Sequence, residues 1–158
     1  MRGPPQITLA QSAVRDFDVI GISYYRKWST RTPAQLGETI AAAKARYKAD
    51  VIVVETAYPF SPVGEDASSD LLGADSLLPG YPATPTGQRD YLVDLTQTVV
   101  DAGGIGVVYW EPGWVSTGCK TRWGTGSNWE NAAWFGLKEH EALPAFDFLG
   151  RRYLKRGK

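Results

Sequence analysis

Three short runs of apolar, mostly β-branched residues limit most strongly how this chain can fold. They occupy residues 18–25, 51–56 and 105–110. Their apolar side chains follow one another without alternating with polar ones, which is typical of strands covered on both faces. Segments with helical periodicity lie between and after these runs. Alternating strands and helices of this kind predict an α/β fold with parallel strands joined by right-handed crossovers.

The two longer helices carry recognisable boundary signals. The first is predicted to begin after Thr32, which forms a capping box with Gln35. The second is predicted to begin at Pro85, the residue type favoured at the first helical position, and to end at Gly103. A third, short helix is predicted around residues 143–152. The segment 57–83 has the Pro, Gly, Ser and Asp content of a long loop.

The 158 residues suffice for one domain with a hydrophobic core. No Gly-x-Gly-x-x-Gly follows a strand, so the phosphate loop of a dinucleotide-binding fold is missing. A complete (β/α)8 barrel typically needs about 250 residues, and three strands are too few for one. The pattern therefore predicts either a small three-layer sheet or a part of a larger barrel.

Charge and cysteine content narrow the function classes. The 17 acidic and 17 basic residues balance, which gives no reason to expect a polyanionic partner. Five of the basic residues lie in the tail 151–158, for which a solvated terminus is predicted, with nucleic-acid or membrane contact as the alternative. Cys119 is the only cysteine, so no internal disulfide can form. Neither a membrane-spanning run nor the apolar core of a signal peptide is found in this sequence.

The carboxyl ends of the three predicted strands should lie together, because the functional groups of parallel α/β proteins gather there. The first end offers Ser23, Tyr24 and Tyr25, the second Glu55, and the third Tyr109, Trp110 and Glu111. Two carboxylates beside aromatic rings suit glycoside hydrolysis. Glu55 follows four β-formers, where a charge needs either a function or a basic partner. Glu111 precedes Pro112 and could equally be a solvated loop residue.

Six Trp and eight Tyr are many for this length. They either fill the core or present faces on which sugar rings stack, and the cluster after residue 109 favours stacking. The loop 65–70, with Asp75, carries carboxylates that could hold calcium or be solvated. His140 lies among charged residues, so neither a His-based triad nor a typical zinc site is expected.

Several ordered blocks resemble glycoside hydrolase family 53, the arabinogalactan endo-β-1,4-galactanases. They are DVIGISYY (18–25), VIVVETAYP (51–59), YPATPTGQ (81–88), GVVYWEPGW (106–114), TRWGTGSNWENAA (121–133) and ALP (142–144). The resemblance covers about residues 16–146. It implies that residues 1–150 form the C-terminal portion, about strands six to eight, of a (β/α)8 TIM barrel, followed by the basic tail 151–158.

The resemblance also implies roles for individual residues. Glu55 would be the nucleophile of a retaining hydrolysis of β-1,4-galactosidic bonds. The expected substrate-binding residues are Tyr25, Trp28, Tyr58, Trp110, Glu111, Trp114 and Trp129. Asp66 and Asp70 fall on the pattern of a calcium loop found in some bacterial members, and no other cofactor is expected. Galactan or arabinogalactan would be the partner, with neither nucleic acid nor membrane involved, and the parent enzyme would be secreted.

Two departures from the family pattern shape the expected function. The family's acid/base is a Glu in an Asn-Glu pair at the end of strand four, and this sequence contains no Asn-Glu pair. The Asp-Phe turn usual before Leu-Pro is also replaced, by residues 135–138. The chain is therefore expected to be a fragment that is inactive by itself. The alternatives are a galactan-binding remnant without catalysis and a small stand-alone α/β domain of unrelated role.

Overall fold

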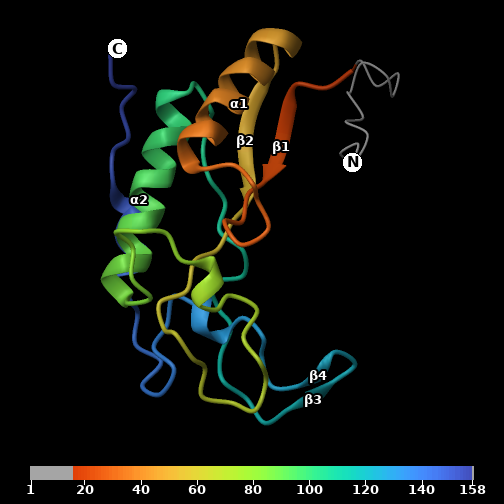
Figure 1. Ribbon diagram of the computed structural model, residues 1–158, viewed down its shortest axis with the longest axis vertical. Helices are drawn as coiled ribbons and strands as arrows, with labels where there is room; N and C mark the ends of the chain where they lie inside the picture. The colour runs from red at the N-terminus through yellow and green to blue at the C-terminus, as the bar shows by residue number, and fades with distance from the viewer. Residues whose placement is uncertain (1–15, 158) are drawn as a thin grey trace.

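The computed structural model describes residues 16–157, and it contains the first two predicted strands and both long helices (Figure 1). The elements are β1 (Val19–Ser23), α1 (Pro33–Tyr47), β2 (Asp50–Glu55), η1 (Ala74–Ser76), α2 (Pro85–Asp101), β3 (Lys120–Thr121), β4 (Gly124–Thr125), η2 (Glu130–Ala132), η3 (Pro144–Phe146) and α3 (Asp147–Gly150). Both main strands run from the helical half of the molecule towards the loops of the other half. The carboxyl ends of β1 and β2 therefore face the long loops.

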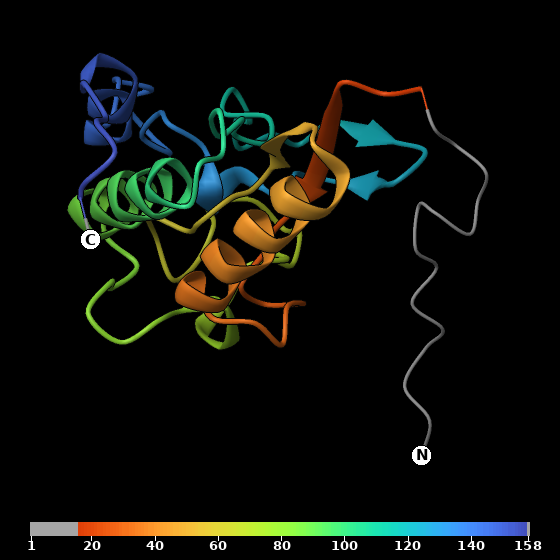
Figure 2. The ribbon, with the colours of Figure 1, turned by 90° about the horizontal axis from the view of Figure 1, so that it is seen from above.

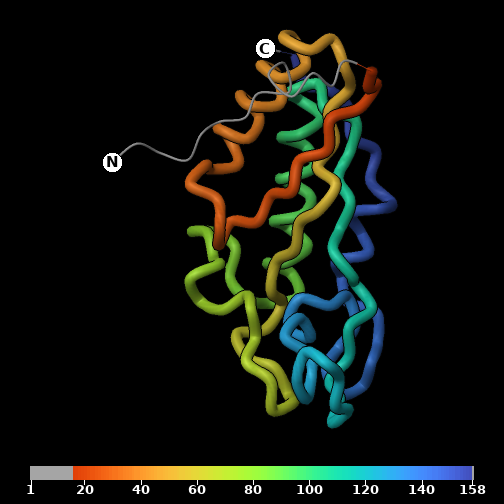
Figure 3. Tube along the Cα trace, turned by 90° about the vertical axis from the view of Figure 1, so that its right-hand side faces the viewer, coloured from red at the N-terminus to blue at the C-terminus, as the bar shows by residue number. Residues whose placement is uncertain are grey.

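β1 and β2 pair in parallel, and a register shift between Ile22 and Ser23 places Ser23 opposite Glu55. The segment 105–110 runs along the other edge of β2 (Figure 3). It is held by an isolated parallel bridge between Val53 and Val107, and by a 2.8 Å hydrogen bond from the Trp110 amide to the Thr56 carbonyl. The third predicted strand is thus present as an extended segment that forms only a few backbone hydrogen bonds with β2 and the residues directly after it. Gly106 lowers its strand preference, and its outer edge has no pairing strand within residues 16–157.

The predicted capping box at the start of α1 is confirmed. The Gln35 amide donates to Thr32 Oγ1 at 3.3 Å, and the Thr32 amide donates to Gln35 Oε1 at 2.9 Å. These two bonds satisfy amides that a helix start otherwise leaves unpaired. At the other end, Lys48 adopts a left-handed conformation with φ of 57°, which ends the helix.

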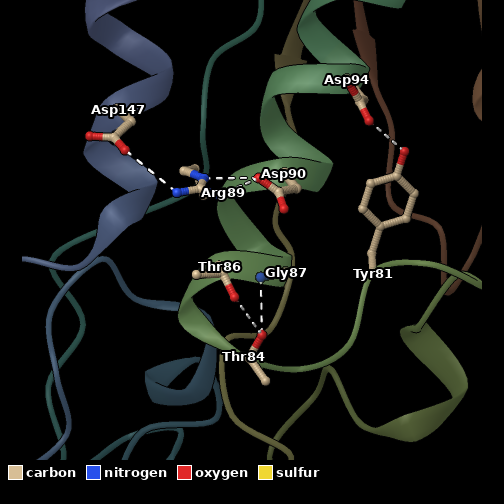
Figure 4. A network of polar contacts seen from close by, with 8 residues as sticks. All are labelled: Tyr81, Thr84, Thr86, Gly87, Arg89, Asp90, Asp94 and Asp147. Carbon is tan, nitrogen blue, oxygen red and sulfur yellow. Dashed lines mark hydrogen bonds and ion pairs between the residues drawn. The ribbon is translucent and has the colours of Figure 1, made fainter.

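The start of α2 is also as predicted, and Figure 4 shows its polar contacts. Thr84 is the N-cap, and its Oγ1 accepts a 3.0 Å hydrogen bond from the Gly87 amide. One turn on, Arg89 pairs with Asp90 of the same helix at 2.8 Å and reaches Asp147 of α3 at 3.9 Å. The Tyr81 hydroxyl donates to Asp94 at 2.8 Å. These contacts tie both the preceding loop and the C-terminal region to α2.

The core lies between the strands and the two helices, which cover the same side of the strands (Figure 2). Val51 and Val53 are fully buried in this core, against residues of α1 and α2. From its sequence, a partial barrel is expected to expose an apolar inner face, with Val51, Val53 and Val107 as candidates to line it. This prediction is wrong for Val51 and Val53, and Val107 is a partly buried residue packed against the same core. The apolar strand residues left exposed are instead Val19, Val54, Ile105 and Val108.

These exposed side chains, and the edge of β1 that pairs with no strand within residues 16–157, predict self-association, because such surfaces favour pairing with other chains. We expect the sedimentation coefficient to rise with protein concentration, and Val54→Lys to weaken this rise by placing a charge on the exposed face. Val63→Lys is the matched control, since Val63 is equally apolar and exposed but lies in a loop. A monomer that unfolds cooperatively at every concentration would instead indicate a self-sufficient fold.

The short closing helix predicted around residues 143–152 is confirmed, with η3 and α3 covering residues 144–150. The tail is not simply solvated: Arg156 donates from its backbone amide and from Nε to the Asp101 carboxylate, each at 2.9 Å. These side-chain and backbone hydrogen bonds lower the pKa of Asp101 to about 2. The tail therefore binds α2 through a carboxylate that remains ionised down to acid pH.

No helix within residues 16–157 combines the length and the apolar character needed to cross a membrane.

Candidate active site

The Glu55 carboxylate lies at the carboxyl end of β2 and is held by two hydroxyl groups. The Tyr25 hydroxyl donates to Oε1 at 2.7 Å, and the Ser23 hydroxyl donates to Oε2 at 2.9 Å. β1 supplies Ser23 directly, because the register shift sets it opposite Glu55. No ion pair within residues 16–157 includes Glu55, so the salt-bridge alternative does not describe it. Each carboxylate oxygen has one fixed donor, which orients the group.

The Tyr25 side chain remains a hydrogen-bond donor at neutral pH. Burial raises its pKa well above the ordinary tyrosine value, and the hydrogen bond to Glu55 raises it further. The negative charges of Glu55 and Glu111 act in the same direction, so Glu111 also lies within electrostatic reach of Tyr25. Glu111 is exposed and adopts a left-handed backbone with φ of 43°, which is uncommon outside glycine. The strand ends thus bring Glu55 into contact with Tyr25, whereas Glu111 makes no hydrogen bond to Tyr25 within residues 16–157.

Four aromatic rings cluster beside Glu55. Tyr25 lies 5.1 Å from Trp28 and 5.8 Å from Trp129, measured between ring centroids. Trp129 also lies 6.2 Å from Trp28 and 6.4 Å from Trp110, so it is the centre of the cluster. Trp28 is 54% exposed and Trp110 is 36% exposed. The cluster therefore keeps apolar faces open to solvent next to an oriented carboxylate, as stacking on a sugar ring requires.

Two of the expected substrate-binding aromatics are placed elsewhere. Tyr58 is only 1% exposed: its ring stacks on Tyr91 at 4.1 Å, and its hydroxyl donates to the Tyr81 carbonyl at 2.7 Å. Tyr58 is therefore a core residue, and its assignment as a substrate contact is wrong. Trp114 is exposed but takes part in no ring contact within residues 16–157, so the structure does not join it to the cluster.

The loop that carries Trp129 is hydrogen-bonded to the loop 57–83 by side chains that were not predicted as functional residues from the sequence. Glu130 is fully buried, and its Oε1 accepts hydrogen bonds from the amides of Glu65 at 2.9 Å and Asp66 at 3.0 Å. Asn131 is also fully buried and donates to the Leu72 carbonyl at 2.8 Å. Both look like ordinary loop residues in the sequence. The only sequence feature that could have indicated their role is that they directly follow a tryptophan, in the triplet Trp-Glu-Asn.

Asp66 and Asp70, the expected calcium ligands, bind backbone amides instead. Asp66 accepts from Ser68 at 2.8 Å and from Ser127 at 2.6 Å, and Asp70 accepts from Gly64 at 2.6 Å. Burial raises the pKa of Asp66, but these hydrogen bonds outweigh burial and hold the pKa below its ordinary value. No group of three or more His, Cys, Asp or Glu within residues 16–157 is arranged to hold a metal. Calcium binding by Asp66 and Asp70 stays a prediction, which metal titration would test.

Asp70→Asn is expected to raise the melting temperature at neutral pH, by about 2 °C or more. Burial raises the pKa of Asp70, the Gly64 amide lowers it, and the charge of Glu130 raises it again, for a net rise. The native state therefore disfavours the ionised form of Asp70. The protein loses stability as the pH rises through the folded-state pKa of Asp70 and the side chain ionises. Asparagine keeps the acceptor for Gly64 without the charge.

Thermal unfolding across a pH series checks this expectation. The gain should be largest at neutral pH and should shrink at acid pH, where Asp70 is protonated in both the folded and the unfolded state. An unchanged or lower melting temperature for Asp70→Asn at neutral pH would contradict the argument. A rise on adding calcium in the wild type alone would point to a metal at these carboxylates.

Comparison with known proteins shows that this chain is similar to members of one enzyme family. The sequence profile of glycosyl hydrolase family 53 matches residues 6–149. An arabinogalactan endo-β-1,4-galactanase of Cellvibrio japonicus is 48% identical over 144 residues, which are 90% of this chain and 38% of the relative. Arabinogalactan endo-β-1,4-galactanase A of Emericella nidulans is 37% identical over 85% of this chain and 37% of its own length.

Comparison with a solved structure points to the same family. The GH53 catalytic domain of Ignisphaera aggregans superposes with a TM-score of 0.74 at 29% identity, over 84% of this chain and 38% of that domain. The chain thus spans less than half the length of each of these relatives. Such catalytic domains are (β/α)8 barrels, and the predicted partial barrel is confirmed. The chain therefore belongs to glycosyl hydrolase family 53.

Proposed function

We propose that this chain supplies the nucleophile and part of the sugar platform for retaining hydrolysis of β-1,4-galactosidic bonds in galactan or arabinogalactan. The observation that carries the proposal is the Glu55 carboxylate, oriented by Tyr25 and Ser23 at the edge of an open aromatic cluster. Its relatives named as galactanases support the substrate class.

The proposed chemistry has two steps. A Glu55 oxygen attacks the anomeric carbon, the glycosidic C–O bond breaks, and the leaving oxygen takes a proton from a general acid. Water then attacks the same carbon and gives a proton back to the deprotonated general acid, the galactosyl ester bond to Glu55 breaks, and the sugar leaves with its original anomeric configuration. Tyr25 and Ser23 hold the carboxylate through both steps. No cofactor takes part, and we assign no step to calcium.

The general acid is the missing part. A retaining pair of carboxyl groups lies about 5–5.5 Å apart, and the family resemblance places the acid in an Asn-Glu pair that these 158 residues lack. General acid catalysis typically contributes about 10²–10⁴-fold. We therefore expect the isolated chain to be nearly inactive on galactan. The complete enzyme would be a secreted polysaccharide hydrolase.

An activated substrate tests the nucleophile without the acid. In 2,4-dinitrophenyl 2-deoxy-2-fluoro-β-D-galactoside, the leaving dinitrophenolate needs no proton, and the fluorine slows hydrolysis of the ester that forms. Intact-mass measurement should show one deoxyfluorogalactosyl group per chain, and peptide mapping should locate it on Glu55. An adduct on a different residue, or none after prolonged incubation, would overturn the proposal.

A galactan-binding remnant is the second candidate function. It is favoured by the exposed rings of Trp28 and Trp110, which need no acid to bind a sugar. Affinity electrophoresis in galactan gels would show retardation under either function, whereas the ester on Glu55 forms only under the first.

A further inference from the structure

We propose that Glu130 is a positioning residue for the sugar platform, because it fixes the loop from which Trp129 reaches the aromatic cluster. This inference rests on the proposed function, since it assigns to Trp129 the contact with substrate. The bond that carries it is the fully buried Glu130 carboxylate accepting the Glu65 and Asp66 amides.

The residues on both sides of Trp129 bind the loop 57–83, whereas the Trp129 ring packs against the aromatic cluster. The Asn128 side chain donates to the Ser69 carbonyl at 2.8 Å, and its own carbonyl accepts from the Leu71 amide at 2.8 Å. The Asn131 carbonyl accepts from the Phe60 amide at 2.8 Å. Trp129 alone contacts Tyr25, Trp28 and Trp110. The backbone of residues 128–131 thus takes its position from the loop after β2.

Glu130 is the most consequential of these attachments. Its side chain is 0% exposed, and two backbone amides donate to one of its oxygens. Losing this acceptor would leave both amides unpaired. The fit is also close, because a Cβ atom added to Gly64 would collide with the Glu130 carboxylate. The site therefore requires both the acid and the adjacent glycine.

Glu55 is positioned by a different part of the molecule. Its donors come from β1 and the residues directly after it, and none of the Glu130 hydrogen bonds involves them. The one link between the two parts is the ring contact of Trp129 with Tyr25, at 5.8 Å, whereas Ser23 and the paired strand backbone hold Glu55 without Trp129. Loss of Glu130 should consequently weaken sugar binding while the nucleophile stays oriented. A residue that merely stabilised the fold would lower both properties together.

The experiment compares Glu130→Ala with Glu130→Gln and Gly64→Ala in the 158-residue chain. For Glu130→Ala and Gly64→Ala we expect galactan binding in affinity electrophoresis to weaken roughly three- to tenfold, the range for one lost aromatic stacking contact. Formation of the Glu55 ester should change less than about twofold, within the scatter expected of uncoupled sites. Glu130→Gln should retain binding, because its Oε1 can still accept both amides. Gly118→Ala is the matched control, since a Cβ there meets no atom within 4 Å.

Tryptophan fluorescence gives a readout that needs no ligand. Glu130→Ala should make the tryptophan emission more accessible to acrylamide, and the change should disappear in a Trp129→Phe background. Unchanged binding and quenching in Glu130→Ala, or a parallel loss of binding and ester formation, would overturn the role of Glu130. If the wild type neither bound galactan nor formed the ester while the quenching result held, the proposed function would fail and the positioning of Trp129 by Glu130 would stand.

Discussion

Glu55→Gln is expected to abolish the covalent adduct with the dinitrophenyl fluorogalactoside, the largest effect that any single substitution should have. An amide oxygen is a far weaker nucleophile than a carboxylate, so the ester bond cannot form. The substitution preserves the side-chain shape, and its Oε1 can still accept from Tyr25. Folding and galactan retardation should therefore persist. Intact-mass measurement over a time course checks the result.

Glu111→Gln is the matched control for this experiment. Glu111 is the carboxylate at the end of the third predicted strand, and it is exposed and begins a loop. We expect the adduct to form on Glu55 in this variant at a rate similar to that of the wild type. An adduct in Glu55→Gln, or the loss of the adduct in Glu111→Gln, would show that Glu55 is not the nucleophile.

The rate of adduct formation in the wild type should stay constant between about pH 7 and 10. An ordinary tyrosine begins to ionise in this range, but the raised pKa keeps Tyr25 protonated.

Gln88→Leu is expected to destabilise the fold by about 1–3 kcal/mol, since a buried group left without a partner costs about that much. Gln88 is fully buried in α2, and its Nε2 lies 2.8 Å from the Tyr58 carbonyl and 3.1 Å from the carbonyls of Ala132 and Ala133. Leucine has a similar volume, so packing changes little while the Ala133 carbonyl loses its donor. The Tyr58 and Ala132 carbonyls keep the Tyr109 hydroxyl, at 3.1 Å and 2.6 Å. Loss of Oε1, which has no partner, offsets part of the cost.

Urea unfolding of Gln88→Leu and of a control, Gln97→Leu, measures this effect. Gln97 also lies on α2 and donates at 2.8 Å to Asp101 and at 2.9 Å to the Leu154 carbonyl, but these bonds are near the surface. The control should therefore lose much less stability. Equal midpoints for wild type and Gln88→Leu would show that the carbonyls of the two loops find other donors.

The elements that depend on local chemistry were predictable from the sequence. The capping box of Thr32 and Gln35 involves residues three positions apart, so it can be read without the fold. Glu55 was placed correctly beside Tyr25, because parallel strands bring their carboxyl ends to one edge.

The residues that were misplaced depend on contacts between distant segments. A continuous apolar run does not say which side chains face the helices, so Val51 and Val53 were assigned to the wrong face. Tyr58 follows a strand end, as a site residue would, yet its ring meets Tyr91 of α2. Glu130 accepts amides 64 and 65 positions away, and neither loop shows this partner in its own composition.

The separate supports of Glu55 and Trp129 have a consequence for how such a protein could diversify. The carboxylate takes its place from paired backbone, whereas the central ring takes its place from contacts between two loops. Substitutions in those loops can shift or reshape the sugar-facing surface while the attacking group stays where the strands put it. Ligand preference and bond-breaking chemistry are therefore separately adjustable, and a library confined to residues 61–72 and 126–131 should yield variants that differ in which oligosaccharides they hold but react through the same atom.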